Sequence, residues 1–213
     1  MRTTILIACV LFASGVAFGE TINFDSDPTG RPPEGWTVTQ TGSGQAKWTV
    51  QGDDTAPSQP NILKQSGEAT FPLCVQDAQL IRNGAVEVKF KPLEGKEDQA
   101  AGIVWRWRDA ENYYITRANA LENNVVLYKV EKGRRQPLDI VGRKGGYGVS
   151  VPVPSGQWST LRVEFADSLF TVSLNSKKQF DVEDSTFPDA GKIGLWTKAD
   201  SVTAFDDFTY EKR

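Results

Sequence analysis

Short runs of β-type residues recur along this chain, and clusters of turn-forming residues separate them. In the run from 84 to 90, small or charged residues alternate with Val86, Val88 and Phe90, which is the pattern of a strand buried on one face. Similar runs are Val125–Val130, Trp158–Phe165, Leu169–Leu174, Lys192–Thr197 and Thr203–Tyr210. No long stretch keeps apolar residues at helical spacing. The sequence therefore predicts an all-β, antiparallel two-sheet sandwich of the jelly-roll type.

Three segments depart from this regular pattern. Asn61–Gln65 and Ser185–Phe187 are candidates for a single helical turn. The polar, Gly-rich segment Thr39–Pro60 is expected to be loop around one strand, Ala46–Val50. There is no linker and no internal repeat, and sandwiches of about 200 residues commonly form one domain. A single domain over residues 20–213 is therefore predicted.

The first residues have the pattern of a targeting segment. Arg2 gives a positive start, Thr4–Phe12 is an apolar run, and Ala17-Phe18-Gly19 has the small-x-small form that signal peptidase cleaves. The run is too short to span a membrane, and no second apolar run follows. We predict a signal peptide over residues 1–19 and export of the mature chain to the periplasm or the extracellular space, without membrane insertion.

The composition excludes several functional classes. The chain contains no His, so neither a Ser-His-Asp or Cys-His mechanism nor a His-rich catalytic zinc site can be built. The net charge of −3 gives little electrostatic support for a nucleic-acid partner. After cleavage, Cys74 is the single remaining Cys. We expect it to be a small buried hydrophobic residue, with a disulfide linking two copies as the alternative.

An ordered series of segments resembles a known family. The series is Asn23–Asp25, Gly35–Trp36, Gly102–Asn119, Trp158–Phe165, Leu169–Asn175, Gly191–Trp196 and Phe205–Phe208. It is similar to the concanavalin A-like jelly rolls, in the branch that contains the 3-keto-disaccharide hydrolase domain family and the exo-inulinase-type β-sandwich. The resemblance implies two stacked antiparallel sheets, one of them bent to form a concave face where glycans bind.

The chain departs from the enzymes of this broad group in its carboxylates. The glucanase-type jelly rolls carry Glu-x-Asp-x-x-Glu on one strand, and no such string occurs here. The nearest cases are Glu97-Asp98, in a Lys-rich turn, and Asp181-Val-Glu183. Glycoside chemistry requires two carboxylates on either side of the scissile bond. Nothing in the sequence singles out such a pair, so the catalytic residues stay unassigned and it remains open whether the chain is an enzyme.

We expect two adjacent segments rich in Trp, Tyr and Arg to form paired strands: Gly102–Arg108 and Asn112–Asn119. Simple alternation places Ile103, Trp105 and Trp107 on one face, with Arg106 on the other. In the second strand, Tyr114 joins the open face if Ile115 faces the core, and Arg117 and Asn119 join it if Ile115 faces outward. Large aromatic residues in strands are usually buried, so core packing is the alternative for each of them.

A later strand supplies a further candidate platform. If Ile193 and Leu195 are core residues, alternation places Trp196 on the open face, unless the loop Arg143–Tyr147 covers it. Aromatic faces stack on sugar rings, and Arg, Lys and Asn donate hydrogen bonds to hydroxyl groups. The predicted ligand-binding residues are Trp105, Arg106, Trp107, Tyr113, Tyr114, Arg117, Asn119, Trp196 and Lys198.

These observations favour an exported protein that binds a carbohydrate on a concave sheet face. The alternatives are a glycoside hydrolase of the 3-keto-disaccharide hydrolase type, working without His, and a laminin-G-like structural or protein-binding module of the cell envelope. No cofactor or metal is required by the sequence. Calcium is the one candidate ion, because Asp25 and Asp27 could meet Asp206 and Asp207 if the terminal strands pair.

Overall fold

The computed structural model describes residues 19–213, and every regular element in this range is a β-strand. The predicted signal peptide over residues 1–19 lies outside the described residues, except for Gly19. Within residues 19–213, no helix is long and apolar enough to cross a membrane. The predicted all-β, antiparallel two-sheet sandwich is confirmed.

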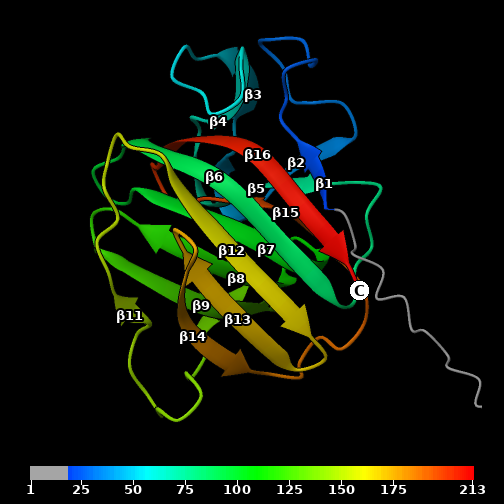
Figure 1. Cartoon of the computed structure of the whole chain (residues 1–213), viewed down its shortest axis with the longest axis vertical. Helices are drawn as coiled ribbons and strands as arrows, with labels where there is room; N and C mark the ends of the chain where they lie inside the picture. Colours follow the sequence, from blue (N-terminus) through cyan, green and yellow to red (C-terminus); the bar gives the residue numbers. More distant parts are fainter. Residues whose placement is uncertain (1–18) are drawn as a thin grey trace, which may run out of the picture.

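The first sheet has the strand order β14-β13-β12-β6-β16-β4-β3, with β1 paired to β16. Its strands are β1 (Glu20–Ile22), β3 (Trp48–Gly52), β4 (Asn61–Gln65), β6 (Gly84–Glu94), β12 (Ser159–Ala166), β13 (Leu169–Leu174), β14 (Lys177–Glu183) and β16 (Val202–Lys212). The pairing of β1 with β16 brings the first and last strands of the described chain together (Figure 1).

The second sheet has the order β10-β9-β8-β7-β15-β5-β2, with β11 paired to β9. Its strands are β2 (Trp36–Gln45), β5 (Glu68–Gln76), β7 (Ala100–Asp109), β8 (Asn112–Asn119), β9 (Asn124–Glu131), β10 (Arg134–Pro137), β11 (Val149–Ser150) and β15 (Lys192–Trp196). Figure 1 shows β6, β12 and β13 of the first sheet lying over β7, β8 and β9 of the second.

The main core lies between the two sheets and follows the alternation in the sequence. Val86, Val88 and Phe90 of β6 point into it, as predicted, and Ile103 of β7 and Leu195 of β15 belong to the same buried cluster. Buried apolar surface stabilises a fold by about 25 cal/mol per Å², so a continuous core of this size is the main stabilising contribution. The free thiol of Cys74 is completely buried in this core, in agreement with the hydrophobic interpretation.

Three expectations about local structure are wrong. Asn61–Gln65 is strand β4, which pairs with β3 and β16, and Ser185–Phe187 forms no helical turn. Much of the segment expected to be loop belongs to β2, which pairs with β5 as far as Gln45. Cross-strand pairing thus outweighs the polar, Gly-rich composition that suggested a loop.

A β-bulge in β7 changes which faces its aromatic residues occupy. The register with β8 shifts between Trp105 and Asp109, and Arg106 adopts a left-handed backbone conformation with φ of 47°. A bulge adds one residue to a strand and reverses the alternation beyond it. Trp105 therefore packs between the sheets, whereas Trp107 packs on the opposite face of the second sheet. The expectation that these two Trp share a face is wrong.

Candidate functional site

The outer face of the second sheet, which is the face turned away from the first sheet, carries a second buried apolar cluster. Its members are Phe71, Leu73, Val75, Ala100, Val104, Tyr113, Ile115, Val126, Tyr128, Val130 and Trp196, with Trp107 partly buried beside them. Burial of a face that no other sheet covers requires that the second sheet curl upon itself.

Contacts between distant strands demonstrate this curl. Strands β2 and β8 stand four positions apart in the second sheet, which corresponds to roughly 19 Å in a flat sheet. Nevertheless, the Thr41 hydroxyl of β2 lies 2.7 Å from the Tyr113 hydroxyl of β8. From the other edge, the Arg135 guanidinium of β10 lies 5.0 Å from the centre of the Phe71 ring of β5. The outer face is therefore concave, and side chains from both edges fill its middle.

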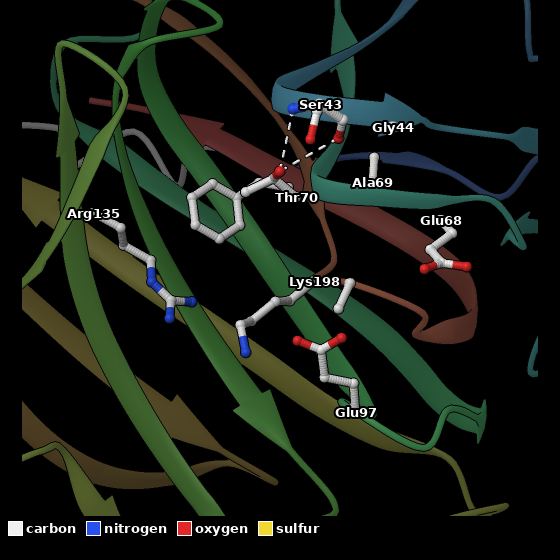
Figure 2. Close-up of a pocket in the computed structure, with 10 residues that line it drawn as sticks. Ser43, Gly44, Glu68, Ala69, Thr70, Glu97, Arg135 and Lys198 are labelled. Atoms are coloured by element: carbon white, nitrogen blue, oxygen red, sulfur yellow. Dashed lines mark hydrogen bonds between the residues drawn. The ribbon is translucent and has the colours of Figure 1, made fainter.

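A pocket of about 600 Å³ remains open at one end of this concave face. That volume is within the usual range for small-molecule sites. The pocket is lined by Ser43, Gly44, Glu68, Ala69, Thr70, Phe71, Glu97, Arg135, Lys198 and Ala199 (Figure 2). It combines one aromatic ring, two cations and two carboxylates.

The Phe71 ring, with Trp196 behind it, and the Arg135 cation form one side of the pocket. The Phe71 and Trp196 rings lie 5.3 Å apart at 32°, and Phe71 covers the fully buried Trp196. The Arg135 guanidinium lies 5.8 Å from the Trp196 ring and 4.5 Å from the Tyr128 ring. Cation–π contacts of this kind stabilise each pair by about 0.5–2 kcal/mol.

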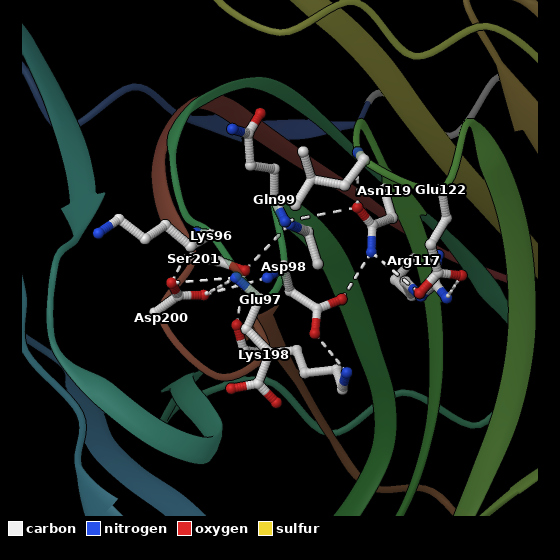
Figure 3. Close-up of polar contacts among 12 residues, drawn as sticks. Lys96, Glu97, Asp98, Gln99, Arg117, Asn119, Glu122, Lys198, Asp200 and Ser201 are labelled. Carbon is white, nitrogen blue, oxygen red and sulfur yellow. Dashed lines mark hydrogen bonds and ion pairs between the residues drawn. The ribbon is translucent and has the colours of Figure 1, made fainter.

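Lys198 is held in the pocket by a buried carboxylate. Its ammonium group forms an ion pair with Asp98, whose side chain is only 1% exposed. The amide of Asn119 donates a second hydrogen bond, of 2.6 Å, to Asp98 (Figure 3). A buried charge is tolerated when it is paired and hydrogen-bonded in this way. Asp98 therefore fixes the position of Lys198.

The same polar network continues along β8 to Arg117. Asn119 also donates to Glu122 at 3.3 Å, and Glu122 accepts a 2.8 Å ion-paired hydrogen bond from the fully buried Arg117. Burial alone would raise the pKa of the Glu122 carboxyl. Hydrogen bonds from Asn124 and Arg117 outweigh that effect, so this pKa lies below its usual value. Glu122 is consequently ionised and anchors the Arg117 guanidinium.

A second carboxylate organises the turn that carries Glu97. Asp200 accepts hydrogen bonds from the backbone N–H groups of Lys96, Glu97 and Asp98, with a shortest distance of 2.6 Å (Figure 3). Burial raises the pKa of Asp200, but these N–H donors outweigh that effect and lower it. Asp200 thus positions the backbone of Glu97 at the pocket and the backbone of Asp98 beside Lys198.

Four of the residues predicted from the sequence lie together around this pocket. Lys198 lines it, Trp196 lies beneath Phe71, and Asn119 and Arg117 belong to the network behind it. The alternative in which Ile115 faces outward is the correct one, because Ile115 lies in the outer-face cluster. In the loop Arg143–Tyr147, the Tyr147 hydroxyl accepts a hydrogen bond of 3.0 Å from Arg117, and the ring that covers Trp196 is that of Phe71.

The other predicted residues lie elsewhere. Tyr113 and Trp107 are on the outer face, but Tyr113 is completely buried under Thr41 of β2. Trp105 and Tyr114 are completely buried between the sheets, which is the core alternative for these two aromatic residues.

Arg106 is not on the concave face either, which corrects the interpretation of this residue. It is completely buried and donates hydrogen bonds to three backbone carbonyls, those of Arg82, Asp167 and Phe187. The bulge in β7 is the physical reason, since it turns Arg106 toward the interior side of the sheet.

Sequence reasoning missed Phe71, Arg135, Glu68 and Glu97 as pocket residues. Phe71 is part of an apolar run that suggests core, and Arg135 follows a turn in a short polar edge strand. Of these four residues, only Glu97 could have been found from the sequence, because Glu97-Asp98 is one of the two places most similar to the Glu-x-Asp-x-x-Glu motif. The other such place, Asp181-Val-Glu183, does not line the pocket.

The Asp residues near the termini form no grouped cation site. Among residues 19–213, no three His, Cys, Asp or Glu side chains gather in a way that could hold a metal ion. Asp206 accepts hydrogen bonds from the Ser58 N–H and hydroxyl at 2.8 and 2.9 Å, and Asp207 pairs with Lys89 at 2.7 Å. Asp25 accepts from the Asn61 N–H at 3.0 Å. The calcium alternative gains no support from these contacts.

Comparison with solved structures identifies the fold. The carbohydrate-binding module CBM66 from Bacillus subtilis superposes with a TM-score of 0.65 at 19% identity, over 84% of this chain and 96% of that chain. The cellulose-induced protein Cip1 gives 0.63 at 15% identity, over 91% and 97%. The β-glucanase of Bacillus licheniformis gives 0.56 at 11% identity, over 94% and 99%.

The chain has a concanavalin A-like jelly-roll fold. At these identities the similarity establishes the fold alone. No protein-family model matches the chain, and no curated protein matches it. The specific 3-keto-disaccharide hydrolase branch implied by the sequence resemblance is not confirmed.

Proposed function

We propose that this chain is an exported carbohydrate-binding β-sandwich protein, and that its pocket at the open end of the concave face holds a sugar residue. The observation that carries the proposal is the pocket itself, which gathers the Phe71 ring, the Arg135 and Lys198 cations and the Glu68 and Glu97 carboxylates around one cavity. Sugar rings present C–H faces to aromatic rings and hydroxyl groups to charged donors and acceptors.

The network behind the pocket supports binding by a preorganised site. Asp98 holds the Lys198 ammonium group and Asp200 holds the backbone of Glu97, so Lys198 and the turn that carries Glu97 lose little freedom when a ligand arrives. The solved structures with this fold include a protein named as a carbohydrate-binding module and one named as a β-glucanase. Export rests on Arg2, the apolar run and Ala17-Phe18-Gly19 in the sequence.

Removal of one pocket carboxylate tests the proposal. Glycan-array screening should identify a bound sugar, and calorimetry should then show that Glu97→Ala weakens its binding by about tenfold to a hundredfold. That range corresponds to the roughly 1.5–3 kcal/mol of a hydrogen bond to a charged group. Glu183→Ala, at an exposed position at the end of β14 outside the pocket, is the matched control and should leave the affinity unchanged. Absence of any glycan binding, with the fold intact, would favour the structural or protein-binding alternative.

A second candidate function is glycoside hydrolysis, which the presence of two carboxylates in one pocket favours. Glu68 and Glu97 come from different segments and face the same pocket (Figure 2). Such a pair can supply a general acid together with a base or nucleophile. Incubation with a panel of glycosides and 3-keto-glycosides should release product if this function holds. Glu68→Gln and Glu97→Gln should then each abolish the release while sugar binding persists.

A further inference from the structure

Arg135 is the one pocket cation whose charge no protein group compensates within residues 19–213. Its guanidinium stacks over the rings of Phe71, Tyr128 and Trp196. None of the ion pairs or side-chain hydrogen bonds in the described part of the chain involves the Arg135 side chain, and its Nη1 is buried without a partner. A guanidinium has five N–H donors, and leaving buried donors unmatched costs free energy.

The other charged groups of the pocket differ from Arg135 in this respect. Lys198 is already neutralised by Asp98 and has the Asn119 network behind it. Glu68 and Glu97 lie across the pocket from Arg135 (Figure 2). The pocket therefore has an uncompensated positive charge at the Arg135 side and negative charge at the opposite side.

We infer that the sugar residue bound in this pocket carries a carboxylate, as a hexuronic acid does, and that this carboxylate docks on Arg135. The inference rests on the proposed carbohydrate-binding function. A planar guanidinium matches a carboxylate with two parallel hydrogen bonds, and such charge-assisted bonds are about twice as strong as neutral ones. Repulsion by Glu68 and Glu97 directs the carboxylate to the Arg135 side, where these two residues can accept hydrogen bonds from the ring hydroxyls.

The test uses three ligands that differ at a single position. Methyl glucuronide, methyl glucoside and the neutral methyl glucuronamide, together with the corresponding galacto series, are titrated into the protein by calorimetry. In one or both series, the uronide should bind about tenfold to a hundredfold more tightly than the glucoside and the amide. The affinity of the uronide should fall as the salt concentration is raised from about 0.05 to about 0.5 M, because salt screens the attraction between its carboxylate and Arg135. The affinities of the neutral ligands should not change.

Two variants with the same change in net charge locate the effect. Arg134 is exposed and Arg135 is its partly buried neighbour on β10. Arg135→Gln should remove the preference for the uronide, whereas Arg134→Gln should keep it. Equal losses in both variants would assign the effect to the overall charge of the protein and overturn the inference. If Arg135→Gln fails to fold, Arg135→Lys, which keeps the charge but not the planar fork, should reduce the preference several-fold.

The possible outcomes separate this inference from the proposed function. Binding of the glucoside, amide and uronide with equal affinity would overturn the carboxylate inference and leave carbohydrate binding standing. If none of these sugars binds and the glycan array is also silent, both proposals fail. If Arg135 only covers the aromatic rings, Arg135→Gln should leave the ratio of uronide to amide affinity unchanged, and that result would overturn the inference.

Discussion

Replacement of the buried Arg106 should destabilise the fold rather than weaken ligand binding. Arg106 is fully buried, and its side chain donates to the carbonyls of Arg82, Asp167 and Phe187, which belong to three separate loops. Burial lowers the pKa of Arg106 from its ordinary value, although not enough to discharge a guanidinium. The side chain therefore acts as a charged link that holds three loops together at one end of the sandwich.

The size of the effect follows from these three carbonyls. Arg106→Met retains most of the side-chain volume but leaves the three acceptors without a donor. Each unsatisfied buried acceptor costs about 1–3 kcal/mol. The bond to Phe187 is fully buried, whereas those to Arg82 and Asp167 are partly accessible, so values near the lower limit apply to the latter two. We expect a loss of about 3–5 kcal/mol, which lowers the Tm of a domain of this size by about 6–20 °C.

Urea and thermal unfolding of the purified variants measure this loss. Arg108→Met is the matched control, because Arg108 is partly exposed and its 3.0 Å ion pair with Asp189 is a surface contact. Such pairs contribute about 0–1 kcal/mol. A finding that Arg106→Met unfolds within 1 kcal/mol of the wild type but no longer binds sugar would refute this reasoning and restore Arg106 as a ligand contact.

Three further outcomes are expected. Asp200→Asn should loosen the turn of Lys96–Asp98, destabilise the protein by about 1–2 kcal/mol and weaken sugar binding. The pKa of Asp200 is lower in the folded protein than in the unfolded chain, so the ionised carboxylate stabilises the fold at pH values above the unfolded-state pKa, which is about 4. This stabilisation is lost as the pH falls further. The Tm of the wild type should therefore decline more steeply below about pH 4 than that of Asp200→Asn, and parallel declines would contradict this. Burial, with a smaller effect from Asp77, raises the pKa of the Cys74 thiol, so a thiol reagent should label Cys74 only after unfolding. Expression in a secreting host should give a mature protein whose first residue, by N-terminal sequencing, is Glu20.

The general fold could be predicted from the sequence because its strands have one apolar face. Period-2 alternation in β6 and the turn residues between runs are local signals, and they place Val86, Val88 and Phe90 correctly in the core. The strand at Asn61–Gln65 was not predictable in this way. Its burial depends on pairing with both β3 and β16, and such long-range pairing leaves little trace in a five-residue window.

The site was only partly predictable, because its key geometry depends on the bulge and the curl of the second sheet. Alternation in β8 correctly groups Arg117 with Asn119, as no bulge interrupts that strand before Asn119. In β7 the extra residue at Arg106 breaks the alternation, and no Gly or Pro marks the position. Arg135 reaches Phe71 only because β10 curls over five strand positions, which no local pattern can indicate.

The distribution of charge around the pocket explains why so polar a site can form on an apolar face. Asp98 and Asp200 look like solvated turn residues in the sequence, yet each accepts hydrogen bonds from more than one donor. Together they hold the Lys198 ammonium group and the backbone of Glu97. A buried polar network rigidifies a site only when its members are satisfied, and this one is largely complete. Arg135 stands outside the network, and among residues 19–213 its guanidinium is held by aromatic rings and by no ion pair. The fold thus pairs Lys198 with Asp98 and leaves Arg135 as the pocket cation that can respond to the charge of a ligand.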